Sequence, residues 1–409
     1  MPTAQNFLER KKGMVILMKI CAVICEYNPF HLGHAYQISE MKKRGAVIAV
    51  MSGSFTQRGD AAVLSKYDRA EIAVQCGANL VLELPFPYSS APAEIFGGAG
   101  VRIAHLFGCV DELCFGSETG DLPSLCLLSD RLQSEDFRTA LSVYLENDRS
   151  QSYRTAVGKV YRDFYGEEYP SDGSNDILSL SYLSALRALH SDITPVALMR
   201  KGEDYNGGGE GFASATTVRA LVKSADWEAV FRSVPRETAE RLLTATKEGR
   251  LADSDRLFFL FAALVRTRRM EDVSDLYDIP RDLAARLWKY GREAGDMETF
   301  LSLVASKNDS PSRVRRAMLT VLLNVKKSDV GDVPYTSVLA ADQTGREILS
   351  MLRKTAHIPI VTKPADAKRY GEAVARAAEL SANADAVWEL LCAVPRSGNA
   401  MIRERPRML

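Results

Sequence analysis

Short apolar runs alternate with amphipathic helical stretches from residue 18 to about residue 200. Five runs have the length and residue types of buried strands: 20–24, 47–51, 80–84, 113–115 and 196–199. Helices are expected between them, near residues 34–44, 62–76, 92–106, 122–165 and 175–190. Because strands that alternate with helices form parallel crossovers, this pattern predicts an α/β fold with a Rossmann-like parallel sheet and helices on both of its faces.

The alternation stops after about residue 225, where helical patterns follow one another. Helices are expected near residues 236–248, 255–268, 281–295, 297–306, 312–326, 344–356 and 367–391, and residues 357–364 form a strand or a buried connector. We therefore predict two domains. Residues 18–225 form the α/β domain, with a helical insert at about 122–170, and residues 226–409 form an α-helical C-terminal domain.

The composition is that of an ordinary globular protein. The chain has 409 residues, of which 46% are hydrophobic and 25% charged, and this length suits two or three domains. Its formal net charge is zero, so any contact with nucleic acid must come from a local patch. Seven cysteines without a metal-binding spacing favour a reduced, cytoplasmic setting. No apolar run approaches the roughly 18 residues of a membrane span, and residues 1–17 are expected to be an extension rather than a signal peptide.

Two of the five histidines lie in the turn between the first strand and the next helix. His31 and His34 are three residues apart at the start of that helix, so both imidazoles can face one triphosphate. Gly33 lets a phosphate approach the backbone, and the N–H groups of a helix start attract phosphate oxygens. The turn therefore predicts a nucleotide site. The alternative is a surface turn that happens to hold two histidines, whereas a zinc site would need a third ligand nearby.

Loops after other strands supply further candidates at the same edge of the predicted sheet. Gln57 and Arg58 follow the second strand and could reach a substrate, or could belong to a solvated loop. Gly116 follows the fourth strand, where an adenine or ribose commonly lies, although it could also form a simple turn. Asn175 opens a helix, either as its N-cap or with its amide directed at a nucleotide.

Cations and hydroxyl groups gather near the end of the α/β domain. Arg200 follows the last predicted strand and could hold a phosphate as a bidentate fork. The glycine-rich run 207–211 could close over a nucleotide as a lid. It precedes a helix that begins with Ser214 and Thr216 and carries Arg219 one turn later. Such a helix start binds phosphate, with simple capping as the alternative.

Six segments of the chain form a recognisable set. They are EYNPFHLGH from Glu26, MSGSFTQRG from Met51, LELP from Leu82, CFGSE from Cys114, NDIL from Asn175 and ASATTVR from Ala213. The set closely resembles the bacterial tRNA(Met) cytidine acetate ligase family of the HxGH nucleotidyltransferase superfamily. The resemblance runs from about residue 18 to the C-terminus and is denser before residue 220.

The resemblance implies an ATP-dependent ligase that activates acetate as acetyl-adenylate with release of pyrophosphate. The enzyme would then acetylate N4 of the wobble cytidine in elongator tRNA(Met). Mg²⁺ is expected as the companion of ATP, although no pair of carboxylates marks its site, and no metal site of the protein itself is expected. No obligatory protein partner is implied. We expect the carboxylate pocket near Tyr27, Ser54 or Gln57.

The same resemblance maps the ATP contacts onto residues 24–37, Gly116, Asn175 and the pair Arg200 and Lys201. With the phosphate-binding candidates, the predicted ATP-binding residues are Ile24, Cys25, Glu26, Tyr27, Asn28, Pro29, Phe30, Gly33, Gln37, Gly116, Asn175, Arg200, Lys201, Ser214 and Thr216. His31, His34 and Arg219 are predicted to be catalytic. Their donors suit the negative charge that develops on the α-phosphate and the leaving pyrophosphate.

A local basic cluster is the candidate for RNA binding. It contains Arg313, Arg315, Arg316 and Lys326, and it has fewer cations than the resembling family carries here. Such side chains can neutralise RNA phosphates, with a solvated helix surface as the alternative.

Two other functions compete with the tRNA ligase. A small-molecule adenylyltransferase would share the histidine and Ser/Thr-Arg elements but would have no use for the long helical region. A non-catalytic RNA-binding protein is less consistent with the intact His31, Gly33, His34 and Arg219.

Overall fold

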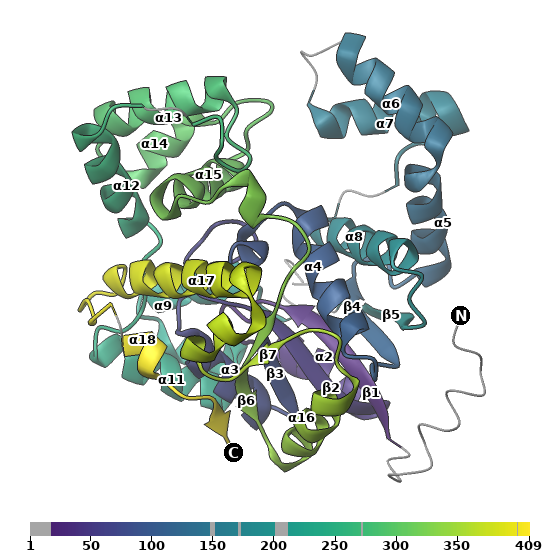
Figure 1. Cartoon of the computed structure of the whole chain (residues 1–409), viewed down its shortest axis with the longest axis vertical. Helices are drawn as coiled ribbons and strands as arrows, with labels where there is room; N and C mark the ends of the chain where they lie inside the picture. The colour runs from purple at the N-terminus through teal and green to yellow at the C-terminus, as the bar shows by residue number, and fades with distance from the viewer. Residues whose placement is uncertain (1–17, 148–151, 171–172, 201–211, 271–272, 399) are drawn as a thin grey trace.

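The computed structural model describes residues 18–147, 152–170, 173–200, 212–270, 273–398 and 400–409. Its centre is one sheet with the strand order β5-β4-β1-β2-β3-β6-β7, in which β8 pairs with β6 (Figure 1). The strands are β1 (Lys19–Cys25), β2 (Gly45–Ser52), β3 (Leu80–Leu84), β4 (Glu112–Ser117), β5 (Thr194–Met199), β6 (Thr336–Ala341), β7 (Ile360–Val361) and β8 (Arg407–Met408). The strands β1 to β5 pair in parallel, as the alternating pattern predicts.

The apolar run of β1 is continuous because both faces of the sheet are covered. Cys21 and Val23 face the hydrophobic core on one side, whereas Ala22 and Ile24 face the core on the other side. A parallel strand that is buried on two faces needs apolar residues at every position rather than at alternate ones. The central position of β1 therefore follows from its sequence.

The helices before residue 225 have the predicted order. They are α2 (Leu32–Lys42), α3 (Lys66–Gln75), α4 (Ala93–Leu106), α5 (Leu122–Gln133), α6 (Glu135–Asn147), α7 (Tyr153–Tyr165), α8 (Ser174–Ala188) and α9 (Ala215–Lys223). The helices α2 and α3 pack on one face of the sheet, and α4 and α8 pack on the other. The segment near 122–165 forms three helices with a small core of their own around Phe137 and Tyr161.

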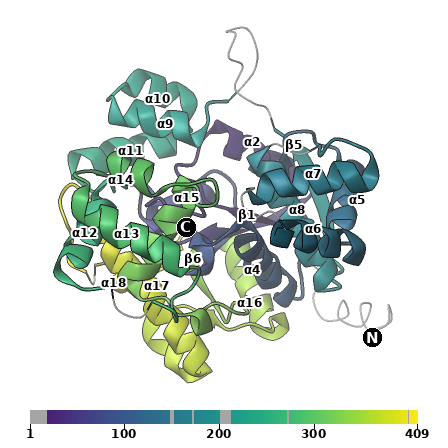
Figure 2. The ribbon, with the colours of Figure 1, turned by 90° about the horizontal axis from the view of Figure 1, so that it is seen from above.

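The region after residue 225 is mainly helical, as expected. Its helices are α10 (Trp227–Ser233), α11 (Arg236–Lys247), α12 (Arg256–Thr267), α13 (Arg281–Glu293), α14 (Met297–Val304), α15 (Pro311–Leu323), α16 (Gln343–Thr355), α17 (Glu372–Leu390) and α18 (Ala400–Arg403). Figures 1 and 2 show α12 to α15 on the opposite side of the molecule from the insert helices α5 to α7. None of the helices in the described residues combines the length and the apolar character that a membrane span requires.

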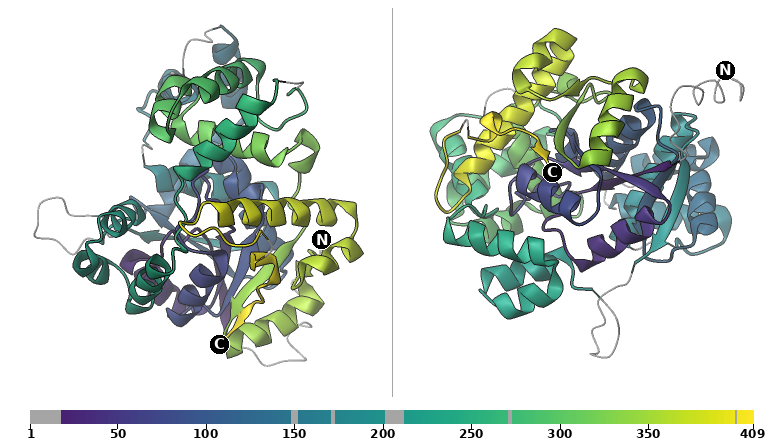
Figure 3. Two further views of the ribbon diagram at one scale, coloured as in Figure 1. Left: turned by 90° about the vertical axis from the view of Figure 1, so that its left-hand side faces the viewer. Right: turned by 90° about the horizontal axis from the view of Figure 1, so that it is seen from below.

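After residue 225 the prediction has one possible strand, at 357–364, where β7 forms, and it lacks β6. The β6 strand pairs antiparallel with β3, with Leu80 opposite Ala341 and Glu83 opposite Ser337. The β7 and β8 strands then pair with β6, so the C-terminal region completes the central sheet (Figure 3). The physical reason is that β3 would otherwise leave an open edge of unpaired N–H and C=O groups. The domain boundary near residue 225 stays a prediction.

A buried cluster of three charges joins α17 to the sheet. The ammonium of Lys66 in α3 lies 2.8 Å from Glu83 Oε1 in β3 and 2.7 Å from Asp385 Oδ2 in α17. Ser54 donates a hydrogen bond of 2.6 Å to the other oxygen of Asp385. Although burial alone would lower the pKa of Lys66, the carboxylates of Asp385 and Glu83 raise it well above its usual value. Lys66 therefore stays charged and compensates two buried carboxylates.

We expect Lys66→Met to lower the free energy of unfolding by about 3–5 kcal/mol, because the substitution leaves two buried carboxylates without their cation. Urea denaturation followed by circular dichroism measures this change. Lys223→Met is the matched control, since Lys223 forms an exposed ion pair with Asp255 and its loss should cost less than about 1 kcal/mol. Equal stabilities of the two variants would contradict a stabilising role for the cluster.

Candidate active site

The turn after β1 is held by hydrogen bonds from two distant segments. The backbone carbonyl of Asn28 accepts a bond of 2.7 Å from Arg219 Nη1 in α9, and its Oδ1 accepts one of 2.8 Å from the Val63 N–H. Tyr27 has a φ of +49°, and the Asn28–Pro29 peptide is cis. The two hydrogen bonds to Asn28 hold this turn in place between β1 and α2.

The two histidines form a reciprocal cap at the start of α2. His31 is the N-cap residue, and its Nδ1 accepts a hydrogen bond of 3.0 Å from the Gly33 N–H. His34 Nδ1 accepts a bond of 3.3 Å from the His31 N–H, and the two rings stack with centroids 3.7 Å apart. Because each Nδ1 is an acceptor, each neutral ring carries its proton on Nε2. The pair therefore offers Nε2–H donors rather than basic nitrogens.

His34 is held in its neutral form by its surroundings. Burial lowers its pKa well below the usual value, and the nearby His31 and Arg200 lower it further. Gly33 keeps this arrangement possible, because a Cβ atom there would lie 2.9 Å from His31 Cε1 and 3.0 Å from its Nδ1. A larger residue would push the imidazole away from its backbone donor.

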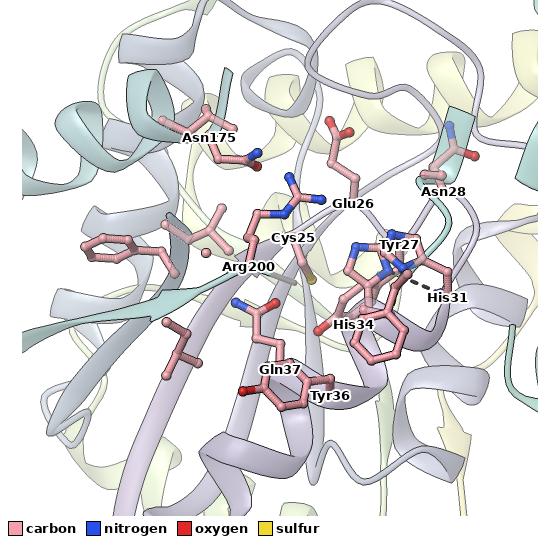
Figure 4. Close-up of a pocket in the computed structure, with 18 of the residues that line it drawn as sticks. Cys25, Glu26, Tyr27, Asn28, His31, His34, Tyr36, Gln37, Asn175 and Arg200 are labelled. Carbon is pink, nitrogen blue, oxygen red and sulfur yellow. Dashed lines mark hydrogen bonds between the residues drawn. The ribbon is translucent and has the colours of Figure 1, made fainter. Parts of the chain in front are cut away.

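A cavity of about 240 Å³ lies at the carboxyl ends of β1, β4 and β5, next to the histidine pair (Figure 4). Thirteen of the predicted residues line it: Ile24, Cys25, Glu26, Tyr27, Asn28, His31, Gly33, His34, Gln37, Gly116, Asn175, Arg200 and Arg219. The structure thus brings together residues from five separate segments of the sequence. Such a convergence of polar groups in a cleft is typical of a binding site.

Several lining residues were not predicted. They are Phe96, Phe115, Leu178, Tyr182, Leu198, Met199, Phe212 and Ala215, whereas Tyr36 lies within the predicted range 24–37. Most are apolar or aromatic, and each of these types also fills hydrophobic cores. Only their neighbours in sequence, such as Gly116 beside Phe115, could have suggested them.

Other predicted residues do not line the cavity. Pro29 and Phe30 are buried, and the Phe30 ring belongs to the hydrophobic core, where it packs 4.8 Å from the Tyr27 ring. Ser214 is the N-cap of α9 and accepts from the Thr217 N–H at 3.2 Å. The exposed Thr216 accepts from Arg219 Nη2 at 3.1 Å, so it positions the guanidinium. The capping alternative therefore describes what Ser214 does in this structure.

Lys201 and the glycine-rich run 207–211, with the lid predicted for it, lie outside the described residues. The same is true of the extension 1–17.

Asn175 does not cap its helix, so that alternative is wrong. The α8 helix begins one residue earlier, with Gly173 at the N-cap position. Instead, Asn175 Nδ2 donates a bond of 2.6 Å to Glu118 Oε1, which also accepts from the Asn175 N–H at 3.2 Å. Burial alone would raise the pKa of Glu118, but these hydrogen bonds lower it. A carboxylate from the loop after β4 therefore takes the capping role.

The structure brings one of the three residues expected at the carboxylate pocket to the cavity. Ser54 is buried and its hydroxyl is used by Asp385, so it does not face the cavity. The side chain of Gln57 donates to the Ala91 carbonyl at 3.1 Å, and its backbone N–H donates to Glu26 Oε1 at 2.6 Å. Of the three candidates, Tyr27 alone lines the cavity.

Arg69 fixes the loops that surround the cavity. Its buried guanidinium donates to the backbone carbonyls of Glu26, Gly53 and Leu64. Burial lowers its pKa to about 10, so the side chain remains charged at neutral pH. One cation therefore ties the ends of β1 and β2 to the start of α3.

The predicted RNA-binding cations already have partners within the chain. Arg313 pairs with Asp278 at 2.8 Å and with Asp309 at 3.3 Å, and Lys326 pairs with Asp275 at 3.3 Å. Arg315 pairs with Asp60 at 3.1 Å, and Arg316 Nη1 donates to the Gln57 carbonyl at 3.3 Å. Two of these side chains thus attach α15 to the loop after β2, and the cluster is not an isolated basic patch.

One group of potential metal ligands occurs in the described part of the chain, away from the cavity. Cys21, Glu112 and Cys114 place their ligand atoms within 4.8 Å of one another. The Glu112 carboxylate is already paired with Arg44 at 2.5 Å and with Lys19 at 2.9 Å. These cations lower its pKa to about 2 and would repel a metal ion. We therefore assign no metal to this group.

Known proteins are similar to this chain over nearly its whole length. The family model described as HIGH Nucleotidyl Transferase matches residues 18–400. The tRNA(Met) cytidine acetate ligase of Fervidobacterium nodosum is 32% identical over 387 residues, which are 91% of this chain and 90% of that protein. The same-named enzyme of Kosmotoga olearia is 33% identical over 383 residues, which are 86% of this chain and 87% of that protein.

The fold is also similar to solved structures. The crystal structure of Thermotoga maritima TmcAL bound with alpha-thio ATP aligns with a TM-score of 0.87 at 29% sequence identity. The alignment covers 96% of this chain and 100% of that chain. An apo form of the same protein aligns with a TM-score of 0.88.

The tautomers of the histidine pair can be tested directly. We expect long-range ¹H–¹⁵N spectra to show His31 and His34 as neutral Nε2–H tautomers at neutral pH. We also expect His34 to become protonated only below the value of about 6.5 that is typical of an exposed histidine. Signals are assigned by substituting each histidine singly. An Nδ1–H tautomer, or protonation of His34 at or above that value, would contradict the hydrogen-bond arrangement.

Proposed function

Because this chain belongs to the HIGH nucleotidyltransferase family, and within it to the tRNA(Met) cytidine acetate ligases, we propose that it is an ATP-dependent tRNA-modifying enzyme. It activates acetate as acetyl-adenylate and releases pyrophosphate. It then transfers the acetyl group to N4 of the wobble cytidine of elongator tRNA(Met). The enzyme acts in the cytoplasm, where tRNA is found, and needs no protein partner.

The histidine pair is the observation that carries this proposal. Two Nε2–H donors, fixed by backbone N–H groups, lie beside the N-terminus of α2 and the guanidinium of Arg219 at one end of the cavity. When acetate attacks the α-phosphorus, negative charge grows on the equatorial oxygens and on the leaving pyrophosphate. Preorganised donors stabilise this charge without having to reorient. The reaction needs no nucleophile from the enzyme, because acetate itself attacks.

The other end of the cavity suits the nucleoside of ATP. Ile24, Phe115, Leu178 and Tyr182 give the cavity apolar walls. Asn175 of α8 adds a polar group on the side away from the histidine pair (Figure 4). Gly116 allows the Arg200 side chain to lie against β4, since a Cβ there would be 3.2 Å from Arg200 Cγ. The alpha-thio ATP in the Thermotoga maritima structure supports a nucleotide in this chain as well.

Mg²⁺ would accompany ATP mainly through the phosphate oxygens. Glu26 is the one carboxylate among the residues that line the cavity in the described structure. Mg²⁺ keeps several water ligands and commonly binds substrate phosphates. The cavity therefore fits a metal that arrives with its nucleotide, and the protein supplies few ligands of its own.

We place part of the tRNA surface on α15. Arg315 and Arg316 contact the loop that follows β2, so this helix lies beside the loop at the cavity edge. Arg313 and Lys326 extend the same surface. Because all four cations have partners in the chain, RNA phosphates would have to compete with those partners for them.

Pyrophosphate release tests this function. We expect release from ATP that depends on acetate, and N4-acetylcytidine in tRNA(Met) after nucleoside analysis. Release only with a phosphorylated small molecule would instead identify an adenylyltransferase. No release with any acceptor would indicate a protein that binds RNA without catalysis.

In the same assay, His34→Ala should lower the rate of adenylate formation by about 10²-fold, because it removes one donor to the transition-state charge. His357→Ala is the control, since that side chain is exposed and is not among the residues that line the cavity. A His34→Ala enzyme with a near-normal rate would remove this residue from the mechanism.

A further inference from the structure

Acetyl transfer to cytidine releases one proton that the cavity has to accept. The nucleophile is an amino group with two hydrogens, and the amide product keeps one of them. As the bond from N4 to the acetyl carbon forms, the carbon–oxygen bond to the adenylate breaks and AMP leaves as its phosphate. The second N4 hydrogen must then pass to a base. This inference rests on the proposed function.

Most ionisable side chains of the cavity cannot take this proton. The Nδ1 atoms of His31 and His34 already accept backbone N–H groups, and their Nε2 atoms carry protons. Burial raises the pKa of the Cys25 thiol, and the phenols of Tyr27 and Tyr182 likewise have raised pKa values because they are buried. Thiols and phenols of this kind stay protonated at neutral pH.

The arginines of the cavity are cations and have no lone pair to offer. Among the described residues that line it, Glu26 is therefore the one side chain with an available basic atom.

Glu26 is held in a fixed position at the end of β1. Its Oε1 accepts the Gln57 N–H at 2.6 Å, and its backbone carbonyl accepts from Arg69 Nη1 at 2.5 Å. Its Oε2 has no hydrogen-bond partner among the described residues. Figure 4 shows the carboxylate between Asn175 and Asn28, on the wall of the cavity. One oxygen thus anchors the group and the other is available to a substrate.

The position of Glu26 also suits a substrate that approaches from α15. The loop that donates to Glu26 through Gln57 accepts a hydrogen bond from Arg316 of that helix. Arg58, the next residue in the loop, is exposed. An RNA strand that follows α15 toward the cavity would reach this loop and Glu26 beside it.

We propose that Glu26 is a catalytic residue that accepts the N4 proton of the cytidine during acetyl transfer. Its carboxylate takes one hydrogen of the attacking amine as the nitrogen bonds to the acetyl carbon. The proton then passes to water when the products leave. The first step needs no base from Glu26, since acetate is already an anion when it attacks ATP.

The surroundings of Glu26 support this role. Burial raises its pKa above the usual value, and the Gln57 N–H and the charges of Arg69 and Arg58 oppose that effect. A carboxylate with a raised pKa is a better base at neutral pH than an ordinary one. The charged and ionisable groups that face it from neighbouring elements are Arg58 and Asp60 of the loop, Arg69 of α3, Tyr182 of α8 and Arg219 of α9.

Glu26→Gln separates the two steps of the reaction. We expect acetate-dependent exchange of pyrophosphate into ATP to fall much less than transfer, because that step needs no base. Single-turnover transfer from preformed acetyl-adenylate to tRNA(Met) should fall by about 10²-fold or more. Glu26→Asp keeps the carboxylate and should retain more transfer than Glu26→Gln.

The pH dependence of transfer gives a second measurement. A base works only when deprotonated, so the wild-type transfer rate should fall as the pH drops through the raised pKa of Glu26. The Glu26→Gln enzyme should lose this dependence. Glu228→Gln is the matched control, because it makes the same change in an exposed ion pair with Arg232 that does not line the cavity. It should keep the wild-type pH profile at saturating tRNA.

Two outcomes would overturn the assignment. If exchange and transfer fall equally in Glu26→Gln, the residue binds ATP or its Mg²⁺ instead. If transfer stays near the wild-type rate, the proton leaves by another route, such as the departing phosphate. A wild-type enzyme without acetate-dependent exchange would contradict the proposed function itself, and this result is seen before any variant is made.

Discussion

The buried guanidinium of Arg69 is the constraint on which the site depends. Two loops meet at the carboxyl edge of the sheet, and together they present three backbone carbonyl oxygens to this one side chain. A buried cation without such acceptors would be strongly unfavourable, so the loops and the arginine stabilise one another. Arg69 therefore fixes the position of Glu26 and of the turn that leads to the histidines.

The cavity contains two kinds of functional group, hydrogen-bond donors and a base. At one end, His31, His34 and Arg219 present hydrogen atoms to a polyphosphate. Beside them, Glu26 presents a lone pair. The neutral state of the imidazoles is essential to this division, because a protonated Nδ1 could not accept the backbone N–H that fixes each ring. The backbone N–H groups that occupy each Nδ1 thus determine what the side chains can do.

The sequence was sufficient to predict the parallel part of the sheet and the histidine turn. Both depend on local patterns: a doubly buried apolar run, and a helix start directly after it. The pairing of β6 with β3 was not predictable, because the two strands lie more than 250 residues apart and the segment is surrounded by helical patterns. The ion pairs of the α15 cations were missed for the same reason, since Asp60 and Asp278 are distant in sequence. The capping of α8 by Glu118 is likewise a contact between separate segments.

The late position of β6 has a consequence for the newly made chain. While the ribosome synthesises the protein, β1 to β5 emerge long before residue 336, and the outer side of β3 remains without a neighbour throughout that time. An uncovered strand edge invites association with other extended segments. Nascent chains are therefore most exposed to misassembly during translation of the helices between α9 and β6.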